Sequence, residues 1–277
     1  MRALIFAIAL AASPALAEEL TPGSMIDWTG DPVAYTLGDW TVTAGATGPE
    51  DARIATLKVE RPGFATLERS FDSFGAGYGV VGAAPLSPGA EPSILFGAYS
   101  GGAHCCMQSI AVTAMGNGLV VGDIGTYDGD GIPLEDIDGD GSYEIPLGDA
   151  RFYYTFDAYA FSPAPTIIHR FKDGIAYDAS LEPQFKSYIE AELAEYAKSC
   201  PAEDGYYLGA CAATLADAAR LGRYDELFAP IAAAFEGGIK PASGWDEFQV
   251  CETDDCKFTD FTLALPHALK LWGYLKD

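Results

Sequence analysis

The sequence predicts an α+β protein, with an antiparallel β-rich domain at residues 18–178 and a small α-helical domain at residues 179–277. Before Asp178, short runs of β-branched and aromatic residues alternate with polar residues between Gly-, Pro- and Asn-containing turns. After Asp178, apolar residues recur at the spacing of a helix. Because no helical pattern interrupts the strands, we expect the front domain to be a sandwich or a propeller-like sheet.

The strands are predicted from two-residue alternation and from the turns that join them. Pro62-Gly63, Asn117-Gly118 and Asp173-Gly174 each indicate a hairpin. We predict strands over Ala55–Glu60, Phe64–Glu68, Pro92–Tyr99, Gln108–Ala114, Leu119–Ile124, Arg151–Phe156, Thr166–Phe171 and Ile175–Tyr177.

The helices are predicted from apolar spacing and from residues typical of helix ends. Pro183 and Pro266 suit first helical turns, and Gly222 suits a helix end. The predicted helices are Phe185–Ala197, Leu208–Leu221, Asp225–Phe235 and Leu263–Leu275. Helices paired in this way are typical of packing or interaction modules.

The first seventeen residues have the pattern of a secretory signal peptide. A basic start at Met1-Arg2 precedes the apolar run Ala3–Ala12, and Ala15-Leu16-Ala17 offers the small residues of a cleavage site. No later stretch is long and apolar enough for a membrane anchor, so we expect a soluble periplasmic or secreted protein.

The charge of the chain limits the kinds of partner that we expect. It has 16 basic and 40 acidic residues, a formal net charge of −24 and a pI near 4.2. Nucleic acids attract proteins with a basic face, so we expect no nucleic-acid partner. An acidic chain in an exported setting instead favours divalent cations.

One loop, residues 136–145, has the pattern of a metal site. Its first, third, fifth and ninth residues are the acids Asp136, Asp138, Asp140 and Glu144, and the seventh is Ser142, whose carbonyl can act as a ligand. The glycines between them permit the tight turn that brings alternate carboxylates together. Calcium binds six to eight oxygen ligands of this kind, so the sequence predicts a calcium site with a structural role.

The loop is not an EF-hand, because Leu147 stands where that motif has a bidentate Glu. Its Asp-apolar-Asp-Gly-Asp-Gly pattern resembles the calcium loop of FG-GAP/VCBS-type β-propeller repeats. The resemblance implies that the calcium ligands are Asp136, Asp138, Asp140, the backbone of Ser142, and Glu144. The stretches Tyr99–Cys106 and Asp149–Phe152 also resemble a group of exported bacterial proteins, which implies no particular activity.

The surroundings of the loop are acidic as well. Nine acids occur from Asp123 to Asp149 inclusive, and no Lys or Arg occurs between Arg69 and Arg151. Asp128 and Asp130 are candidates for further ligands or for a weaker second site. The alternative is a solvated acidic turn that binds no ion.

The six cysteines are interpreted as disulfides, as is usual in an exported chain. They are Cys105, Cys106, Cys200, Cys211, Cys251 and Cys256. Short spacing favours the pairs Cys200–Cys211 and Cys251–Cys256, which leaves Cys105 with Cys106, but other partners for Cys200 and Cys211 stay open. A rival hypothesis is a copper or redox site at His104-Cys105-Cys106-Met107.

The functional expectation is a calcium-stabilised recognition or interaction module, with a protein or glycan partner. No nucleophile elbow, zinc-protease motif, phosphate-binding loop or CxxC pair occurs in the sequence, so we predict no catalytic residue. The alternative is a calcium-stabilised hydrolase acting on envelope or extracellular polymer. Trp40, Trp245 and Trp272 are candidates for a sugar site, although core packing is the usual role of tryptophan.

Overall fold

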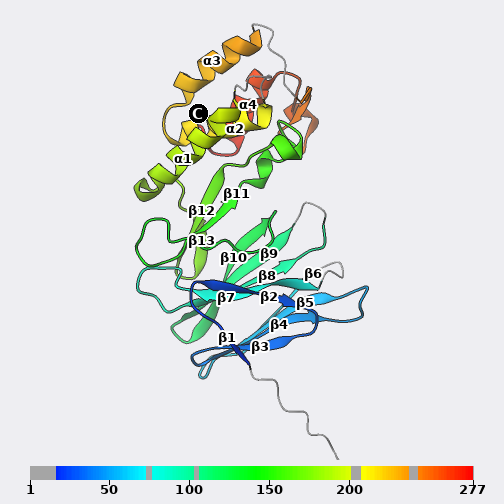
Figure 1. Ribbon diagram of the computed structural model, residues 1–277, viewed down its shortest axis with the longest axis vertical. Helices are drawn as coiled ribbons and strands as arrows, with labels where there is room; N and C mark the ends of the chain where they lie inside the picture. The colour runs from blue at the N-terminus through cyan, green and yellow to red at the C-terminus, as the bar shows by residue number, and fades with distance from the viewer. Residues whose placement is uncertain (1–16, 73–76, 103–105, 201–206, 237–242, 277) are drawn as a thin grey trace, which may run out of the picture.

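The computed structural model describes residues 17–72, 77–102, 106–200, 207–236 and 243–276, and shows an α+β fold (Figure 1). The strands are β1 (Glu18–Glu19), β2 (Ser24–Thr29), β3 (Val33–Leu37), β4 (Trp40–Thr47), β5 (Ile54–Glu60), β6 (Leu67–Asp72), β7 (Tyr78–Ala84), β8 (Ser93–Tyr99), β9 (Met107–Met115), β10 (Gly118–Tyr127), β11 (Ile145–Gly148), β12 (Thr166–Lys172), β13 (Ile175–Asp178), β14 (Phe248–Gln249) and β15 (Lys257–Phe258). The helices are α1 (Lys186–Tyr196), α2 (Leu208–Arg220), α3 (Tyr224–Glu236) and α4 (Phe261–Leu271).

The N-terminal half is a sandwich of two five-stranded sheets. Their strand orders are β1-β3-β4-β5-β6 and β10-β9-β8-β7-β2. Side chains that alternate along the strands fill the space between the sheets, and the rings of Trp28 and Phe96 stack there with their centroids 5.6 Å apart. Gly79 leaves room for Trp28, because a Cβ at Gly79 would lie 2.7 Å from the indole ring.

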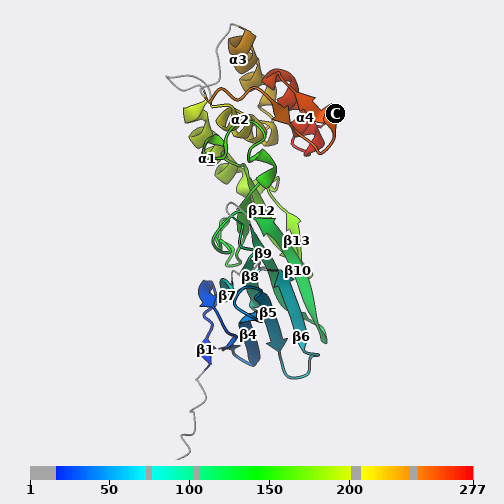
Figure 2. The ribbon, with the colours of Figure 1, turned by 90° about the vertical axis from the view of Figure 1, so that its right-hand side faces the viewer.

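A third sheet connects the sandwich with the helices. Strands β11, β12 and β13 form an antiparallel sheet that rises from the sandwich toward the helical end of the molecule (Figures 1 and 2). Ile145, Leu147 and Phe171 of this sheet pack with Leu95 and Met107 of the sandwich. On the other side, Ile168 packs with Phe185 and Ile189 at the start of the helical half. The β11–β13 sheet therefore carries the contacts between the two ends.

The helical half has its own core, in which α2 is the central element. Eleven consecutive residues of α2, Leu208–Ala218, are buried. The side chain of Asp157 accepts a hydrogen bond from the N–H of Leu208 (3.0 Å) and so caps the helix start from a distant loop. Phe152 and Phe156, which precede the predicted boundary at residue 178/179, pack in this helical core.

Most of the predicted strands and all four predicted helices are present within a few residues of their predicted ends. The predicted strand Arg151–Phe156 is wrong. Residues Ala150–Phe152 form a 3₁₀ turn capped by Asp149, and Tyr154 adopts a left-handed φ of 59°. The segment is rich in aromatic residues because Phe152 and Phe156 fill the helical core, not because it belongs to a sheet.

Two further predicted elements are shifted. The strand predicted at Phe64–Glu68 is β6, which begins only at Leu67. The last helix begins at Phe261, before the predicted start, because the side chain of Asp260 accepts a hydrogen bond from Thr262 N–H (2.8 Å) and caps it there. Pro266 therefore lies in the interior of α4.

Candidate metal centre

The acidic loop is a closed turn at the junction of the two halves. Backbone hydrogen bonds pair Glu135 with Glu144 in both directions, at 3.1 Å and 2.7 Å, and close the base of the loop. Next to it, Tyr143 N–H donates to the carbonyl of Pro85 in the sandwich (2.9 Å). Ile137 packs against the cluster that contains residues of β12 and α1. The loop is thus attached to both ends of the molecule.

Carboxylate oxygens of three loop residues converge. One oxygen each of Asp136, Asp138 and Glu144 lies within 4.8 Å of the other two. Asp136 is exposed, Asp138 is partly buried, and Glu144 is fully buried. Gly139 and Gly141, with φ of 74° and 84°, make the left-handed turns that fold these side chains to one side, as the sequence predicts.

Of the other two predicted ligands, Asp140 and the carbonyl of Ser142, Asp140 is engaged in hydrogen bonds within the protein. Asp140 Oδ1 accepts hydrogen bonds from the N–H and hydroxyl of Ser142, at 2.8 Å and 2.6 Å. Asp140 Oδ2 accepts from Nη2 of Arg170 (2.8 Å). Burial alone would raise the pKa of Asp140, but the bonds from Ser142 and the charge of Arg170 lower it below its usual value. Asp140 is therefore an ionised group at the edge of the cluster.

Arg170, on β12, is the cation of the site. Its guanidinium lies 3.6 Å from Asp138, 2.8 Å from Asp140, 3.3 Å from Glu144 and 3.3 Å from Glu182. Its side chain is only 14% exposed, and its pairs with Asp138 and Glu144 are shielded from solvent, whereas Asp140 and Glu182 are more exposed. The single positive charge of Arg170 cannot neutralise these four acidic side chains and the nearby Asp136. The site therefore keeps an excess of negative charge.

Glu144 is the most constrained group of the site. The pKa of Glu144 is raised to about 7, chiefly by burial and also by the charges of Asp138 and Asp140, while the N–H of Ile137 and the charge of Arg170 limit the rise. Its Oε2 accepts the N–H of Ile137 (3.0 Å). Its buried Oε1 has no hydrogen-bond partner, although Nε of Arg170 lies 3.3 Å away. A buried carboxylate in this state is stabilised by a proton or by a further cation.

The three converging carboxylates are close enough together to hold a metal ion. Two oxygens bound to one calcium ion at about 2.4 Å each can lie up to about 4.8 Å apart, and the oxygens of Asp136, Asp138 and Glu144 lie within that limit of one another. The donor set consists of hard carboxylate oxygens, as calcium prefers. Arg170 competes for Asp138 and Glu144, so a bound ion requires its guanidinium to turn toward Glu182.

The acids upstream of the loop do not extend the cluster. Asp128 accepts a hydrogen bond from the hydroxyl of Tyr159, and it lines with Asp130 a separate depression of about 410 Å³. Within the described ranges, the acids that gather closely enough to share an ion are Asp136, Asp138 and Glu144.

The three candidate tryptophans differ in their surroundings. Trp40 is buried, with Arg61 stacked over its ring, and Trp272 packs on the helical core. Trp245 lines two neighbouring depressions of about 270 and 400 Å³, and its buried Nε1 has no hydrogen-bond partner. Tyr154, 51% exposed, lines the larger depression together with Trp245.

Two predicted disulfides are present. They are Cys200–Cys211, next to the start of α2, and Cys251–Cys256, at the end of the β14–β15 hairpin. His104 and Cys105 lie outside the described residues, so the Cys105–Cys106 pair and the copper site stay predictions. Residues 1–16 of the predicted signal peptide also lie outside the described residues.

Arg170 is the functional residue that sequence reasoning missed. The strand register would have revealed Arg170 as a partner of the loop. Ile145 pairs with His169, so the next residue on that strand, Arg170, lies opposite Glu144. The absence of basic residues near the loop in sequence obscured this partner, because it lies on a strand 26 positions farther along the chain.

Comparison with known proteins gives two curated relatives. An uncharacterized protein of Sinorhizobium fredii is 34% identical over 192 residues, which is 67% of this chain and 30% of the relative. A probable thylakoid lumen protein of Synechocystis is 31% identical over 194 residues, which is 67% of this chain and 57% of the relative. The chain spans less than two thirds of the length of either relative. No family model and no solved structure matches the chain.

In the described part of the chain, no helix combines the length and apolar character needed to cross a bilayer.

Proposed function

We propose that this chain is an exported, soluble recognition protein in which the acidic loop binds one calcium ion. The export part is supported by the leader pattern of residues 1–17 and by a relative that is named as a probable thylakoid lumen protein. The two disulfides fit an oxidising compartment, periplasmic or extracellular.

The observation that carries calcium binding is the convergence on Glu144. A fully buried carboxylate, with one oxygen lacking a hydrogen bond, lies beside Asp136 and Asp138 at ligand spacing. Calcium would add ionic bonds where Arg170 alone leaves negative charge in excess. The likeness to FG-GAP/VCBS calcium loops belongs to the same proposal.

The role of the ion is structural. The loop contacts the sandwich through Tyr143 and the helical half through Ile137, so an ion that orders the loop also stiffens the junction. Extracellular calcium loops bind at about 10⁻⁴ to 10⁻³ M, which makes the stiffening responsive to environmental calcium.

A melting experiment tests the metal site. Calcium in excess of Kd should raise the melting temperature of metal-stripped protein, because ligand binding to the folded state adds about 1–2 kcal/mol at five to fifty times Kd. The exposed residue Asp136 can be changed to Asn without disturbing a buried contact, and Asp136→Asn should remove the shift. Asp130→Asn is the control, since it makes the same charge change outside the cluster. An equal shift in all three proteins would contradict the assignment.

Recognition is proposed at the depression beside Trp245. Tyr154 and Trp245 supply aromatic surface, and Asp246, Glu247, Gln249 and Lys257 supply polar groups around it. Aromatic faces with a polar rim suit the apolar faces and hydroxyls of a sugar, so the proposed partner class is a glycan. Tyr154 is held at φ 59°, a conformation that costs energy and is found more often at functional positions.

Glycan binding is measured by co-sedimentation with insoluble envelope and extracellular polysaccharides. Trp245→Ala should lose binding, whereas Trp40→Phe, a change in the sandwich core, should keep it. Polymer cleavage during the assay would instead favour the hydrolase alternative.

A further inference from the structure

The two described disulfides differ in their access to solvent. Cys200 and Cys211 are 6% and 0% exposed and lie in the helical core. Cys251 is partly exposed, at the tip of the β14–β15 hairpin, while its partner Cys256 is 9% exposed. Thiol–disulfide exchange requires that an incoming thiolate reach a sulfur atom. Of the two disulfides, the hairpin disulfide is therefore the more accessible, and Cys251 is its more exposed cysteine.

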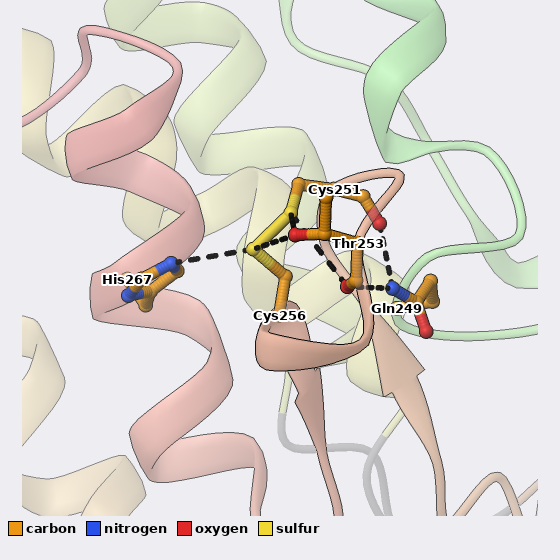
Figure 3. The surroundings of a disulfide bond; sticks show 5 residues. All are labelled: Gln249, Cys251, Thr253, Cys256 and His267. Carbon is orange, nitrogen blue, oxygen red and sulfur yellow. Dashed lines mark hydrogen bonds between the residues drawn. A yellow bond between two sulfur atoms is a disulfide. The ribbon is translucent and has the colours of Figure 1, made fainter.

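Polar side chains surround the hairpin disulfide on both sides (Figure 3). His267, which projects from α4, places Nε2 3.8 Å from Sγ of Cys256. The hydroxyl of Thr253 lies 3.2 Å from Sγ of Cys251 and 3.9 Å from Sγ of Cys256. These groups can hydrogen-bond a thiolate, and the imidazole is on the side of the buried sulfur.

The hairpin is held together by more than the disulfide. The N–H of Val250 donates to the carbonyl of Cys256 (3.0 Å), and the N–H of Cys256 donates to that of Thr253 (3.1 Å). The side-chain amide of Gln249 donates to the carbonyls of Cys251 and Thr253, at 2.6 Å and 2.8 Å. These hydrogen bonds would therefore hold the turn in place after the disulfide is reduced. Both thiols would stay close to one another, so the disulfide could form again.

We propose that Cys251–Cys256 is a thiol-exchange site that opens and closes in the folded protein. The thiolate of an external thiol attacks Sγ of Cys251, the Cys251–Cys256 bond breaks, and its electron pair leaves on Sγ of Cys256. His267 stabilises this leaving thiolate, and a proton from the imidazole or from water completes the thiol. A second external thiolate then attacks the external sulfur of the mixed disulfide and releases Cys251, so two external thiols are oxidised to a disulfide and the hairpin gains two electrons and two protons.

The site lies beside the depression proposed for recognition. Gln249, which holds the turn, and Lys257, which follows Cys256, both line that depression. The exchange itself does not depend on glycan binding or on calcium, and its failure would leave both of those proposals standing.

The test is a graded reduction of the full chain. Folded protein is equilibrated with increasing reduced glutathione, trapped by alkylation, and analysed by peptide mass spectrometry. We expect Cys251–Cys256 to open while Cys200–Cys211 stays closed and the circular dichroism spectrum is unchanged, with the glutathione adduct on Cys251. Opening of both disulfides together, opening only with loss of the fold, or an adduct mainly on Cys256 would overturn the proposal.

His267→Phe isolates the role of the imidazole. The variant keeps a ring against Phe258, which His267 contacts with centroids 5.2 Å apart, but removes the nitrogen. We expect an unchanged melting temperature and a rate of exchange at least about threefold slower, because a less stabilised thiolate leaves more slowly. A slower rate that appears only with a lower melting temperature, or an unchanged rate, would overturn the assignment of His267.

Discussion

Arg170 holds Asp138, Asp140 and Glu144 of the acidic loop with one guanidinium. In sequence it is one of two basic residues, with Lys172, on the strand Thr166–Lys172, and nothing marks it as a partner of the loop. The carboxylates and glycines of the loop could be predicted because they lie within ten residues. Arg170 could not, because its place opposite Glu144 depends on the pairing of β11 with β12.

Replacing Arg170 separates its role from that of calcium. In metal-free protein, Arg170→Met should lower the free energy of unfolding by about 3 kcal/mol, because it leaves buried carboxylates without their counter-charge. The same change removes a competing cation, so calcium should bind about tenfold or more tightly. Urea unfolding with and without calcium measures both effects.

Lys58→Met is the control for this change, since Lys58 pairs with Glu60 on the exposed face of β5. It should alter stability by less than about 1 kcal/mol. If calcium did not restore Arg170→Met, the guanidinium would be the sole counter-ion of the loop.

Asp217, at 0% exposure in α2, makes stability depend on pH. The pKa of Asp217 is raised to about 8, chiefly by burial and also by the charge of Glu192, while Arg220 limits the rise. Unfolded Asp titrates near its model value of 3.8, so between about pH 4 and 8 the folded state holds a proton that the unfolded state lacks. This contribution to the free energy of unfolding therefore falls as pH rises, by at most about 1.4 kcal/mol per pH unit.

Denaturant titrations across that pH range check the dependence. Asp217→Asn should flatten the decline, because an amide does not ionise. Glu226→Gln, at an exposed position of α3, should leave the slope as it is. Parallel curves for wild type and Asp217→Asn would mean that Asp217 is ionised throughout.

Among the elements, α2 depends on distant residues that no local pattern reveals. Asp157 caps its first N–H, and Gly209 lies where a Cβ would meet the carbonyl oxygen of Phe161 at 2.2 Å. The apolar spacing was enough to predict α2 itself, whereas its cap lies about fifty residues away. The same limit explains the false strand at Arg151–Phe156, where Phe152 and Phe156 pack in a helical core that lies far away in the sequence.

Removal of the Cys200–Cys211 disulfide tests the stability of this element. The bond links the turn after α1 to the first turn of α2 and lies in the core. Replacing both cysteines by Ala should lower the free energy of unfolding by about 3 kcal/mol, the usual value for a loop of this length. The melting temperature should fall clearly, and a loss below about 1 kcal/mol would mean that the helical core holds the turn unaided.

At the scale of the whole molecule, the net charge is −24, so the acidic side chains repel one another and this repulsion destabilises the folded state. The melting temperature of metal-stripped protein should therefore rise between low salt and about 0.5 M sodium chloride, because ions screen this repulsion over a few ångströms. Scanning calorimetry in the two buffers checks the rise. A melting temperature that falls with salt would show that attractive pairs such as those of Arg170 outweigh the repulsion.

The division into a β-rich front and a helical back could be predicted from the change in apolar spacing near Asp178. The sheet that joins them could not be separated from the sandwich, because β12 and β13 are joined by a hairpin turn at Asp173-Gly174 and are predicted in the same way as the sandwich strands. Its place between the two ends depends on which side chains pack on which core. That arrangement puts the acidic loop at the junction, and gives a calcium ion there its proposed effect on the whole molecule.

Isothermal titration of the metal-stripped full chain with calcium tests this account most directly. We predict heat that fits one ion per chain with a Kd of about 10⁻⁴ to 10⁻³ M, and none with Asp136→Asn. Absence of heat in wild type up to about ten times that Kd would contradict calcium binding and leave Arg170 as the only cation of the loop.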